Sequence, residues 1–392
     1  MSDRARFLRH VAQTSPAPMG LEIAGGEGVY LHTTDGKKYL DLIAGIGVSA
    51  LGHNHPAIVH AVQEQAGKYM HTLVYGEFVL APQARLAALL SDQLPEGLDN
   101  VYFVNSGTEA TEGAMKLAKR ATGRGEFISA RRSYHGSTQG SASLQWPHDF
   151  TEAFAPLLPG VSHLDFNCDY CLQQITESTA AVILETVQAE WGIRKPRQEW
   201  LQAVRKRCDE VGALLILDEI QAGMGRTGTL FAFEQYGVVP DILLLAKGFG
   251  GGMPLGAFVA RREVMELLTK DPVLGHITTF GGHPVSCAAG LATMETLLAQ
   301  PELIGSVKRK EALFHELLVH PRIRQVRSAG LWMAVELTDF DEVRATIAAC
   351  LERELITDWF LWNERSLRIA PPLIITEEEI RVACGIIMEA LK

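Results

Sequence analysis

The chain has 392 residues, and its 36 Lys and Arg against 46 Asp and Glu give a formal net charge of −10. With 47% hydrophobic and 21% charged residues, the composition is that of a folded globular protein and excludes disorder. The acidic balance argues against nucleic acid or an anionic membrane as the main partner. No run approaches the ~20 apolar residues of a membrane span, and the N-terminus lacks the apolar core of a signal peptide. We therefore expect a cytoplasmic protein, and its length predicts more than one domain.

The N-terminal region contains a β-hairpin pattern. Apolar and polar residues alternate over Gly28–His32 and Lys38–Leu42, on either side of an Asp-Gly turn at Asp35. A long helical pattern then begins at Pro56.

From there to about Pro284, short apolar runs alternate with longer helical patterns. The predicted strands are Val101–Val104, Glu126–Ala130, Ala181–Leu184, Ala213–Leu217 and Asp241–Ala246. The predicted helices are Ala81–Gln93, Glu109–Ala121 and Arg197–Val211. This alternation is typical of βαβ units, and it predicts an α/β fold with a mostly parallel sheet covered by helices on both faces.

The last hundred residues follow a different pattern. Helices are predicted over Val285–Ala299, Pro301–Leu318 and Glu377–Leu391, and a strand over Leu331–Leu337. We expect three parts: an N-terminal segment, 1–50, that packs with a small domain; a large domain, 51–290; and the small C-terminal domain itself, 291–392.

The six cysteines include one C-x-x-C pair, Cys168 and Cys171. A structural zinc site requires a second ligand pair of similar spacing, and the sequence has none. We therefore expect no metal site, and six reduced thiols as in a cytosolic protein.

Ligands of open α/β sheets bind beyond the carboxyl ends of the strands, so the residues that follow each predicted strand are the candidates. Ser106, Gly107 and Thr108 follow the first strand of the alternating region and precede a helix. The free N–H groups and dipole of a helix start suit a phosphate, although Ser and Thr are also ordinary helix caps. This segment alone does not separate a phosphate site from a cap.

Three further groups follow other strands. Asp218 ends an apolar strand, where an acid requires a cation or a hydrogen-bonding partner; that partner is either structural or a protonated heterocyclic nitrogen. Lys247 stands between an apolar strand and a glycine-rich loop, where loss of solvent favours a nucleophilic amine. Tyr134, with His135, is placed to stack on a flat ring or to belong to the core. A phosphate cradle, a ring-pairing acid, an imine-forming lysine and a stacking aromatic together indicate pyridoxal 5′-phosphate (PLP) chemistry.

With these segments in place, the chain resembles the class III PLP-dependent aminotransferases of fold type I, the ornithine, acetylornithine and 4-aminobutyrate type. The resemblance runs from Gly28–Gly36 to Leu367–Leu373, and its most specific segments are Asn105–Ala110, Asp218–Gln221 and Thr279–Gly282. It implies a large PLP-binding domain, a smaller α/β domain, and a homodimer whose subunits share their active sites.

The resemblance also implies roles for residues around the cofactor. Lys247 would bind PLP covalently and then act as the general base, while Asp218 would keep the pyridine nitrogen protonated. The remaining cofactor contacts would be Gln221 to the ring hydroxyl, Ser106, Gly107 and Thr108 to the phosphate, Tyr134 and His135 to the ring, and Thr279 to the phosphate from the partner subunit.

Three residues are implied on the substrate side. Arg368 would bind the substrate α-carboxylate as a bidentate pair, and the catalytic acid Glu190 would mask that arginine when an ω-amine is present. Glu185, five residues before Glu190, is counted with the substrate-facing residues. The alternative interpretations are that Arg368 is an ordinary surface arginine and that Glu190 is an ordinary surface acid.

The activity implied is transfer of an amino group from an ω-amino acid of the acetylornithine or ornithine type to 2-oxoglutarate, by a ping-pong mechanism. Ser137 stands where the family usually has an arginine near the distal end of the substrate. Other ω-amines or 4-aminobutyrate therefore stay open as donors. A dialkylglycine-type decarboxylase also stays open, because the orientation of the substrate on the cofactor decides which bond breaks. The intact Lys247, Asp218 and Arg368 argue against a non-enzymatic PLP-binding protein. The segment Ile356–Trp362 is aromatic where aliphatic residues are expected.

Overall fold

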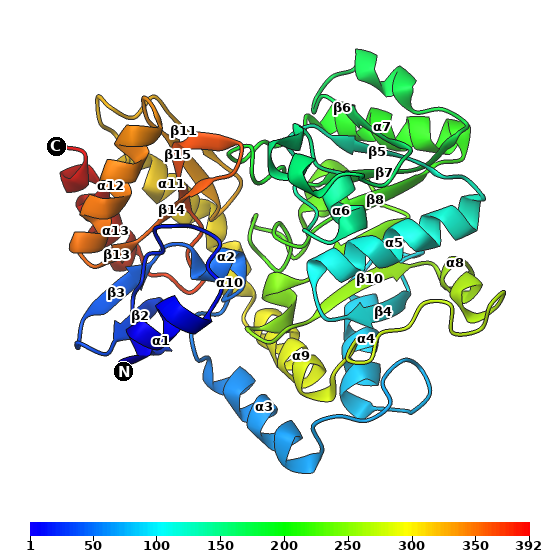
Figure 1. Ribbon diagram of the computed structural model, residues 1–392, viewed down its shortest axis with the longest axis horizontal. Coiled ribbons are helices and arrows are strands. Elements are labelled where there is room, and N and C mark those ends of the chain that lie inside the picture. Colours follow the sequence, from blue (N-terminus) through cyan, green and yellow to red (C-terminus); the bar gives the residue numbers. More distant parts are fainter.

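The computed structural model describes residues 1–392, which form two lobes built on three sheets (Figure 1). The larger lobe contains a seven-stranded sheet in the order β4-β10-β9-β8-β7-β5-β6. Neighbouring strands pair in parallel except for β10, which is antiparallel to both β4 and β9. The predicted mostly parallel sheet is confirmed. The strands are β4 (Asn100–Val104), β5 (Glu126–Ala130), β6 (Val161–Leu164), β7 (Thr179–Glu185), β8 (Leu214–Asp218), β9 (Ile242–Leu245) and β10 (Gly256–Ala260).

Both faces of this sheet are covered, as the period of two along its strands requires. Ile183 of β7 packs in an apolar cluster with residues of α5 (Gly107–Thr122). Val182, one residue earlier, packs in the cluster that contains Trp200 of α7 (Gln198–Val211). Every residue of β7 is buried, which explains the apolar run from Ala180 to Leu184.

The other helices are distributed over the two lobes, and some of them, such as α9, are largely buried. The long predicted helices are confirmed, but the one predicted over 301–318 is divided, because Ser306 bonds through its hydroxyl to the carbonyl of Leu303 and ends the first part. The α-helices are α1 (Asp3–His10), α2 (Ala44–Gly47), α3 (Pro56–Lys68), α4 (Ala81–Asp92), α6 (Gln139–Ser143), α8 (Arg262–Met265), α9 (Pro284–Ala299), α10 (Pro301–Gly305), α11 (Val307–Leu317), α12 (Phe340–Glu352) and α13 (Glu377–Ala390). The 3₁₀ helices are η1 (His148–Phe150), η2 (Glu152–Phe154), η3 (Tyr170–Gln174), η4 (Ala232–Tyr236), η5 (Lys247–Gly250) and η6 (Glu266–Thr269). No helix is both long and apolar enough to cross a lipid bilayer.

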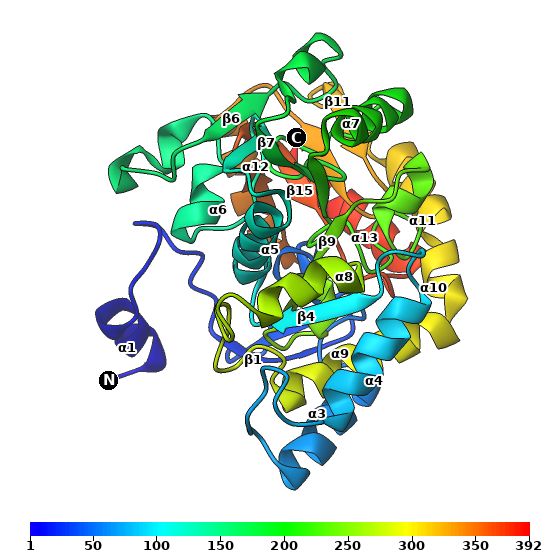
Figure 2. The same cartoon turned by 90° about the vertical axis from the view of Figure 1, so that its right-hand side faces the viewer.

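The smaller lobe combines both ends of the chain in two four-stranded sheets, β1-β2-β3-β13 and β11-β12-β15-β14. The predicted hairpin is confirmed as β2 and β3, and β3 pairs in parallel with β13. The blue and orange segments therefore lie together in Figure 1, while α1, which buries no residue, stands apart from the body in Figure 2. The strands are β1 (Ile23–Glu27), β2 (Tyr30–Thr33), β3 (Lys38–Asp41), β11 (Gln325–Ser328), β12 (Met333–Glu336), β13 (Leu355–Ile356), β14 (Asp358–Phe360) and β15 (Asn363–Ile369).

The domain boundaries at 50 and 290 stay predictions. Position 290 falls within α9, a continuous helix, so the two parts are connected there by regular structure.

One cysteine prediction is wrong. Cys168 and Cys171 form a disulfide, whereas free thiols are expected from the sequence. The turn before η3 brings their Cα atoms to 5.4 Å, within the range that a disulfide spans. The other four cysteines are free and buried.

The contact of α5 with the sheet depends on a glycine. A methyl group at Gly113 would collide with the ring of Phe258 on β10. We expect Gly113→Ala to lower the free energy of unfolding by about 1–3 kcal/mol, because a close-packed contact must open. Urea unfolding would measure this. Gly67→Ala on α3 is the matched control, since its methyl group meets open space and should stabilise the helix by roughly 0.5–1 kcal/mol. Equal stability of the two variants would contradict the packing argument.

Candidate active site

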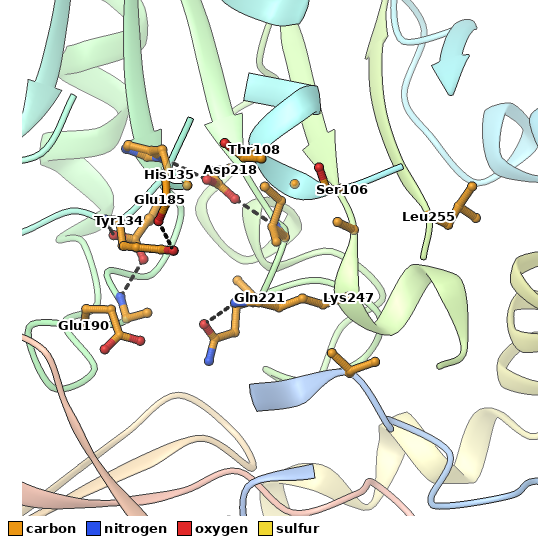
Figure 3. Close-up of a pocket in the computed structure, with 18 of the residues that line it drawn as sticks. Ser106, Thr108, Tyr134, His135, Glu185, Glu190, Asp218, Gln221, Lys247 and Leu255 are labelled. Carbon is orange, nitrogen blue, oxygen red and sulfur yellow. Dashed lines mark hydrogen bonds and ion pairs between the residues drawn. The ribbon is translucent and has the colours of Figure 1, made fainter. Parts of the chain in front are cut away.

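A cavity of about 500 Å³ lies at the carboxyl ends of β4, β7, β8 and β9 (Figure 3). Residues that follow these strands line it, and Trp332 of the smaller lobe closes one side. A volume of this size suits a small cofactor with its substrate. The position is the one expected for ligands of an open α/β sheet.

Lys247 enters this cavity directly after β9, as the first residue of η5. Its φ of 49° lies in the left-handed region, which is a strained conformation for a non-glycine residue. Nζ donates a hydrogen bond to Gln221 Oε1 at 2.7 Å. Burial lowers the pKa of Lys247, although Glu190 and Asp218 act in the opposite direction. A lysine with a lowered pKa is suited to act as a nucleophilic amine.

Asp218, the last residue of β8, is 5% exposed and held from two sides. Its Oδ2 lies 2.8 Å from Nδ1 of His135, and its Oδ1 accepts a hydrogen bond from the backbone N–H of Ile220 at 2.9 Å. Figure 3 shows the His135–Asp218 contact beside the Lys247–Gln221 contact. The carboxylate is thus oriented at the floor of the cavity, as an ion partner for a cationic ring atom would be.

The N-terminus of α5 contributes Ser106, Gly107 and Thr108 to the same cavity. The Ser106 hydroxyl accepts a hydrogen bond from the N–H of Glu109 at 3.3 Å, so this serine is a helix cap. Thr108 Oγ1 bonds to the hydroxyls of Thr138 and Ser141 at 2.6 and 2.7 Å. The first-turn N–H groups of α5 remain directed out of the helix, where an anion binds.

Tyr134 and Ser137 also line the cavity and are joined by a hydrogen bond of 2.9 Å between their hydroxyls. Glu185 positions this loop: its Oε1 accepts from the N–H of Tyr134 at 3.0 Å, and its Oε2 from that of Ala189 at 2.8 Å. Burial, and then the charge of Asp218, raise the pKa of Glu185 well above its ordinary value. Glu185 lines the cavity but has both oxygens engaged by the backbone.

Glu190 and Arg368 form a bidentate ion pair at the edge of the cavity. Nη1 and Nη2 of Arg368 donate to Oε1 and Oε2 of Glu190, each at 2.9 Å. Leu361, in the turn between β14 and β15, donates its N–H to Glu190 Oε2 at 3.0 Å. Glu190 lines the cavity and Arg368 does not, so the glutamate separates the arginine from the space beside Lys247.

Two residues depart from the compact group. Thr279 is exposed and does not line the cavity of its own chain. Asp358 was not singled out from the sequence, yet it lies 3.0 Å from Nε of Arg368. The signal that could have found it is that Asp358 is the one charged residue in the aromatic segment Ile356–Trp362.

The sequence model of the aminotransferase class-III family matches residues 11–391. The chain belongs to the class III aminotransferases. It is 42% identical to the acetylornithine aminotransferase of Methanopyrus kandleri over 94% of this chain and 93% of that protein. It is 40% identical to the putrescine aminotransferase of Pectobacterium atrosepticum over 89% and 77% of the two chains. The ornithine aminotransferase structure from Toxoplasma gondii superimposes with a TM-score of 0.91 at 30% identity, over 99% of this chain and 92% of that one.

Class III aminotransferases use PLP, and the residues of the cavity fit this cofactor. Gln221 Nε2 and His135 Nε2 are buried without hydrogen-bonding partners, so polar groups are available for a ligand. A methyl group at Gly107 would lie 2.8 Å from Ile220 Cδ1, so there is no room for a side chain at this position. Glycine therefore leaves the backbone at the start of α5 open to a ligand. An amine, a fixed carboxylate and a helix N-terminus match the aldehyde, the ring nitrogen and the phosphate of PLP in chemical character.

Proposed function

We propose that this class III aminotransferase transfers the amino group of an ω-amino acid of the acetylornithine or ornithine type to 2-oxoglutarate, in two half-reactions. The observation that carries the proposal is the bidentate Glu190–Arg368 pair at the edge of the cavity. Such a pair suits one site to two unlike substrates. With Glu190 in place the edge presents no free cation to an ω-amine, and with Glu190 displaced the guanidinium offers a planar fork to an α-carboxylate.

We assign the cavity residues as follows. When bound, PLP supplies an electron sink for the carbon that loses its proton. Lys247 Nζ would take up that proton as the general base, a role for which its burial and lowered pKa suit it. Asp218, oriented by His135, would hold a proton on the ring nitrogen, and Gln221 would donate a hydrogen bond to the ring hydroxyl through its free Nε2. Tyr134 would pack on the ring, and the α5 N-terminus with Thr108 would hold the phosphate.

Two observations bear on the donor. Relatives named for acetylornithine support the acetylornithine type, since the chain matches one over nearly its whole length. Ser137, bonded to Tyr134, places no cation near the distal end of the substrate, which favours a donor without a distal carboxylate as the second candidate. A relative named for putrescine is consistent with this candidate.

The decisive experiment is a half-reaction panel. The PLP-loaded enzyme would be mixed with single amines, and the loss of the visible absorbance of the cofactor would be followed. The panel contains N-acetylornithine, ornithine, 4-aminobutyrate, lysine, putrescine and a dialkylglycine. Fast loss with N-acetylornithine or ornithine alone supports the first donor class, and fast loss with putrescine supports the second. Release of carbon dioxide from the dialkylglycine would contradict transamination as the main reaction.

The proposed role of Arg368 predicts a specific defect. We expect Arg368→Lys to weaken 2-oxoglutarate about tenfold or more, because a point charge cannot replace a planar fork that binds a carboxylate through two hydrogen bonds. The KM for 2-oxoglutarate and that for an ω-amine would be compared in steady-state assays. The ω-amine KM should change less than threefold, roughly. Arg365→Lys, an exposed arginine of the same strand, is the control, and an unchanged acceptor KM in Arg368→Lys would exclude the clamp.

We also propose a homodimer with shared active sites. Val79 is 96% exposed and Phe78 is 56% exposed, and both line a second cavity of about 680 Å³. Exposed apolar side chains around a cavity are typical of an interface, and a second copy of the chain is the occupant that would also bring Thr279 to a neighbouring active site. Sedimentation of the enzyme at micromolar concentration tests this.

A cytoplasmic location and the exclusion of membrane and nucleic-acid partners stay predictions from composition.

A further inference from the structure

Arg368 has a second acidic neighbour. Strands β14 and β15 pair antiparallel, and the register places Asp358 directly opposite Arg368. Asp358 Oδ1 lies 3.0 Å from Arg368 Nε, on the edge of the guanidinium that Glu190 does not contact. The side chain of Arg368 is 4% exposed and that of Asp358 is 20% exposed. The contact is therefore largely shielded from water. Charge interactions are stronger in such a low-dielectric environment than in water.

The surroundings of the guanidinium hold more negative than positive charge. Nη2 also donates to the carbonyl of Trp359 at 2.8 Å, and the ring of Phe360 lies 4.5 Å from the guanidinium carbon. Neither Nε nor Asp358 Oδ1 has a hydrogen bond, so the contact between them is ionic rather than directional. Burial lowers the pKa of Arg368, but Glu190 and Asp358 together more than offset this and raise it.

The two acids differ in how they are held. Glu190 is in the loop after β7, lines the cavity, and is tied to the smaller lobe only through the guanidinium and the backbone of the β14–β15 turn. Asp358 belongs to a strand, and the β14–β15 pairing fixes it opposite Arg368. A substrate carboxylate can displace Glu190, but the sheet keeps Asp358 in place.

We propose that Asp358 is the resident counter-ion of Arg368, a positioning residue that keeps the guanidinium paired while Glu190 and a substrate carboxylate exchange. This inference rests on the proposed function, in which Arg368 binds that carboxylate. Its physical basis is that a buried charge left without a partner is strongly unfavourable. With Asp358 opposite, the arginine retains one carboxylate after Glu190 departs, so opening the pair leaves no uncompensated charge.

The proposal has a consequence for binding that distinguishes it from simple masking. In the natural enzyme a carboxylate ligand replaces the carboxylate of Glu190 at Arg368. Asp358 repels these two carboxylates about equally, so its effect cancels in the exchange. Asp358→Asn alone should thus leave the affinity for a carboxylate within about threefold. The effect of Asp358 appears only when Glu190 is neutral, because the arginine then has no other acid.

The first test measures ligand binding rather than turnover. Glutarate, an unreactive dicarboxylate, would be titrated calorimetrically into the PLP-loaded enzyme and into the variants E190Q, D358N and E190Q/D358N. We expect the double variant to bind glutarate about tenfold more tightly than E190Q, because the coupling of close charge pairs is of this order or larger. Binding by the double variant within about twofold of E190Q would overturn the proposal. Asp341→Asn, at an exposed acid of the smaller lobe, is the matched control.

The titration should be made at pH 8. Burial raises the pKa of Asp358 to about 6, against the lowering effect of Arg368, and Glu190 and Asp41 add to the rise. The charged groups that face Asp358 are thus Arg368 on β15, Glu190 in the loop after β7 and Asp41 on β3. At pH 8 the carboxylate is ionised, so replacement by asparagine removes a full charge.

The second test covers the case in which the double variant is too unstable to titrate. Thermal unfolding of the four proteins would be compared, and the double variant should lose roughly 3 °C or more beyond the sum of the two single losses. Adding Arg368→Met to the double variant should recover most of that excess, because the unpaired charge is removed. Additive losses, or no recovery, would refute the counter-ion role. If Arg368→Lys leaves acceptor affinity unchanged while the thermal losses are non-additive, the proposed function fails and the counter-ion role of Asp358 stands.

Discussion

Lys247→Ala is expected to abolish amino transfer, with a loss of at least about 10⁴-fold in the half-reaction rate. In the proposed function this lysine provides both the amine that holds the cofactor and the group that moves the proton, and no other lysine lines the cavity. Gln221, which Nζ contacts at 2.7 Å, has no basic nitrogen to replace it. The rate would be measured by mixing the PLP-loaded variant with the best donor from the amine panel.

The matched control is Lys206→Ala, at an exposed lysine on α7, which should keep the full rate. Circular dichroism and the bound PLP content would show that Lys247→Ala is folded and loaded. Turnover within tenfold of the natural enzyme, in a variant with cofactor bound, would exclude Lys247 as the covalent and proton-moving residue.

Asp218→Asn is expected to reduce the half-reaction rate roughly 10³-fold, the order of effect that follows loss of a preorganised charge next to developing charge. Asparagine keeps the shape of the side chain and can still contact His135, but it carries no negative charge to hold a proton on the ring nitrogen. The electron sink would then be weakened while the architecture is retained. Stopped-flow absorbance with a single donor would measure the rate.

An exposed acid provides the comparison. Asp165→Asn removes a carboxylate that makes only a 3.6 Å surface contact with Arg131, and it should not change the rate. If Asp218→Asn also retained its rate, the ring nitrogen would have to be protonated by another group.

Much of the larger lobe can be predicted from the sequence because its strands are buried on both faces and read as apolar runs. The predicted strand over 126–130 coincides with β5, and those at β7, β8 and β9 differ by only one or two residues at their ends. Two strands of this sheet, β6 at its edge and β10 in its interior, were not predicted. Strand β10 follows the glycine-rich loop after Lys247 and inserts antiparallel between β4 and β9, so its position depends on strand pairing and not on a local sequence pattern.

The residues of the site also differ in how far the sequence predicts them. The residues at strand ends, such as Asp218 and Lys247, could be named because the sheet brings consecutive carboxyl ends to one edge, and the structure places them around one cavity. Asp358 could not be named in this way. Its meeting with Arg368 depends on the register between β14 and β15, and that pairing contains an irregularity between Trp359 and Phe360. A shift of one residue would direct the acid to the opposite face of the sheet.

The parallel pairing of β3 with β13 has a consequence for how the protein is made. Residues 38–41 leave the ribosome early, yet their partner strand begins only at Leu355. At a synthesis rate of 5–20 residues per second, roughly 15–60 s separate the two. During that interval β3 has an unpaired edge on which other strands could form. The seven strands of the larger sheet all lie between residues 100 and 260, so this sheet can assemble before the smaller lobe is complete. The N-terminal hairpin can therefore complete its sheet only after β13 has been synthesised.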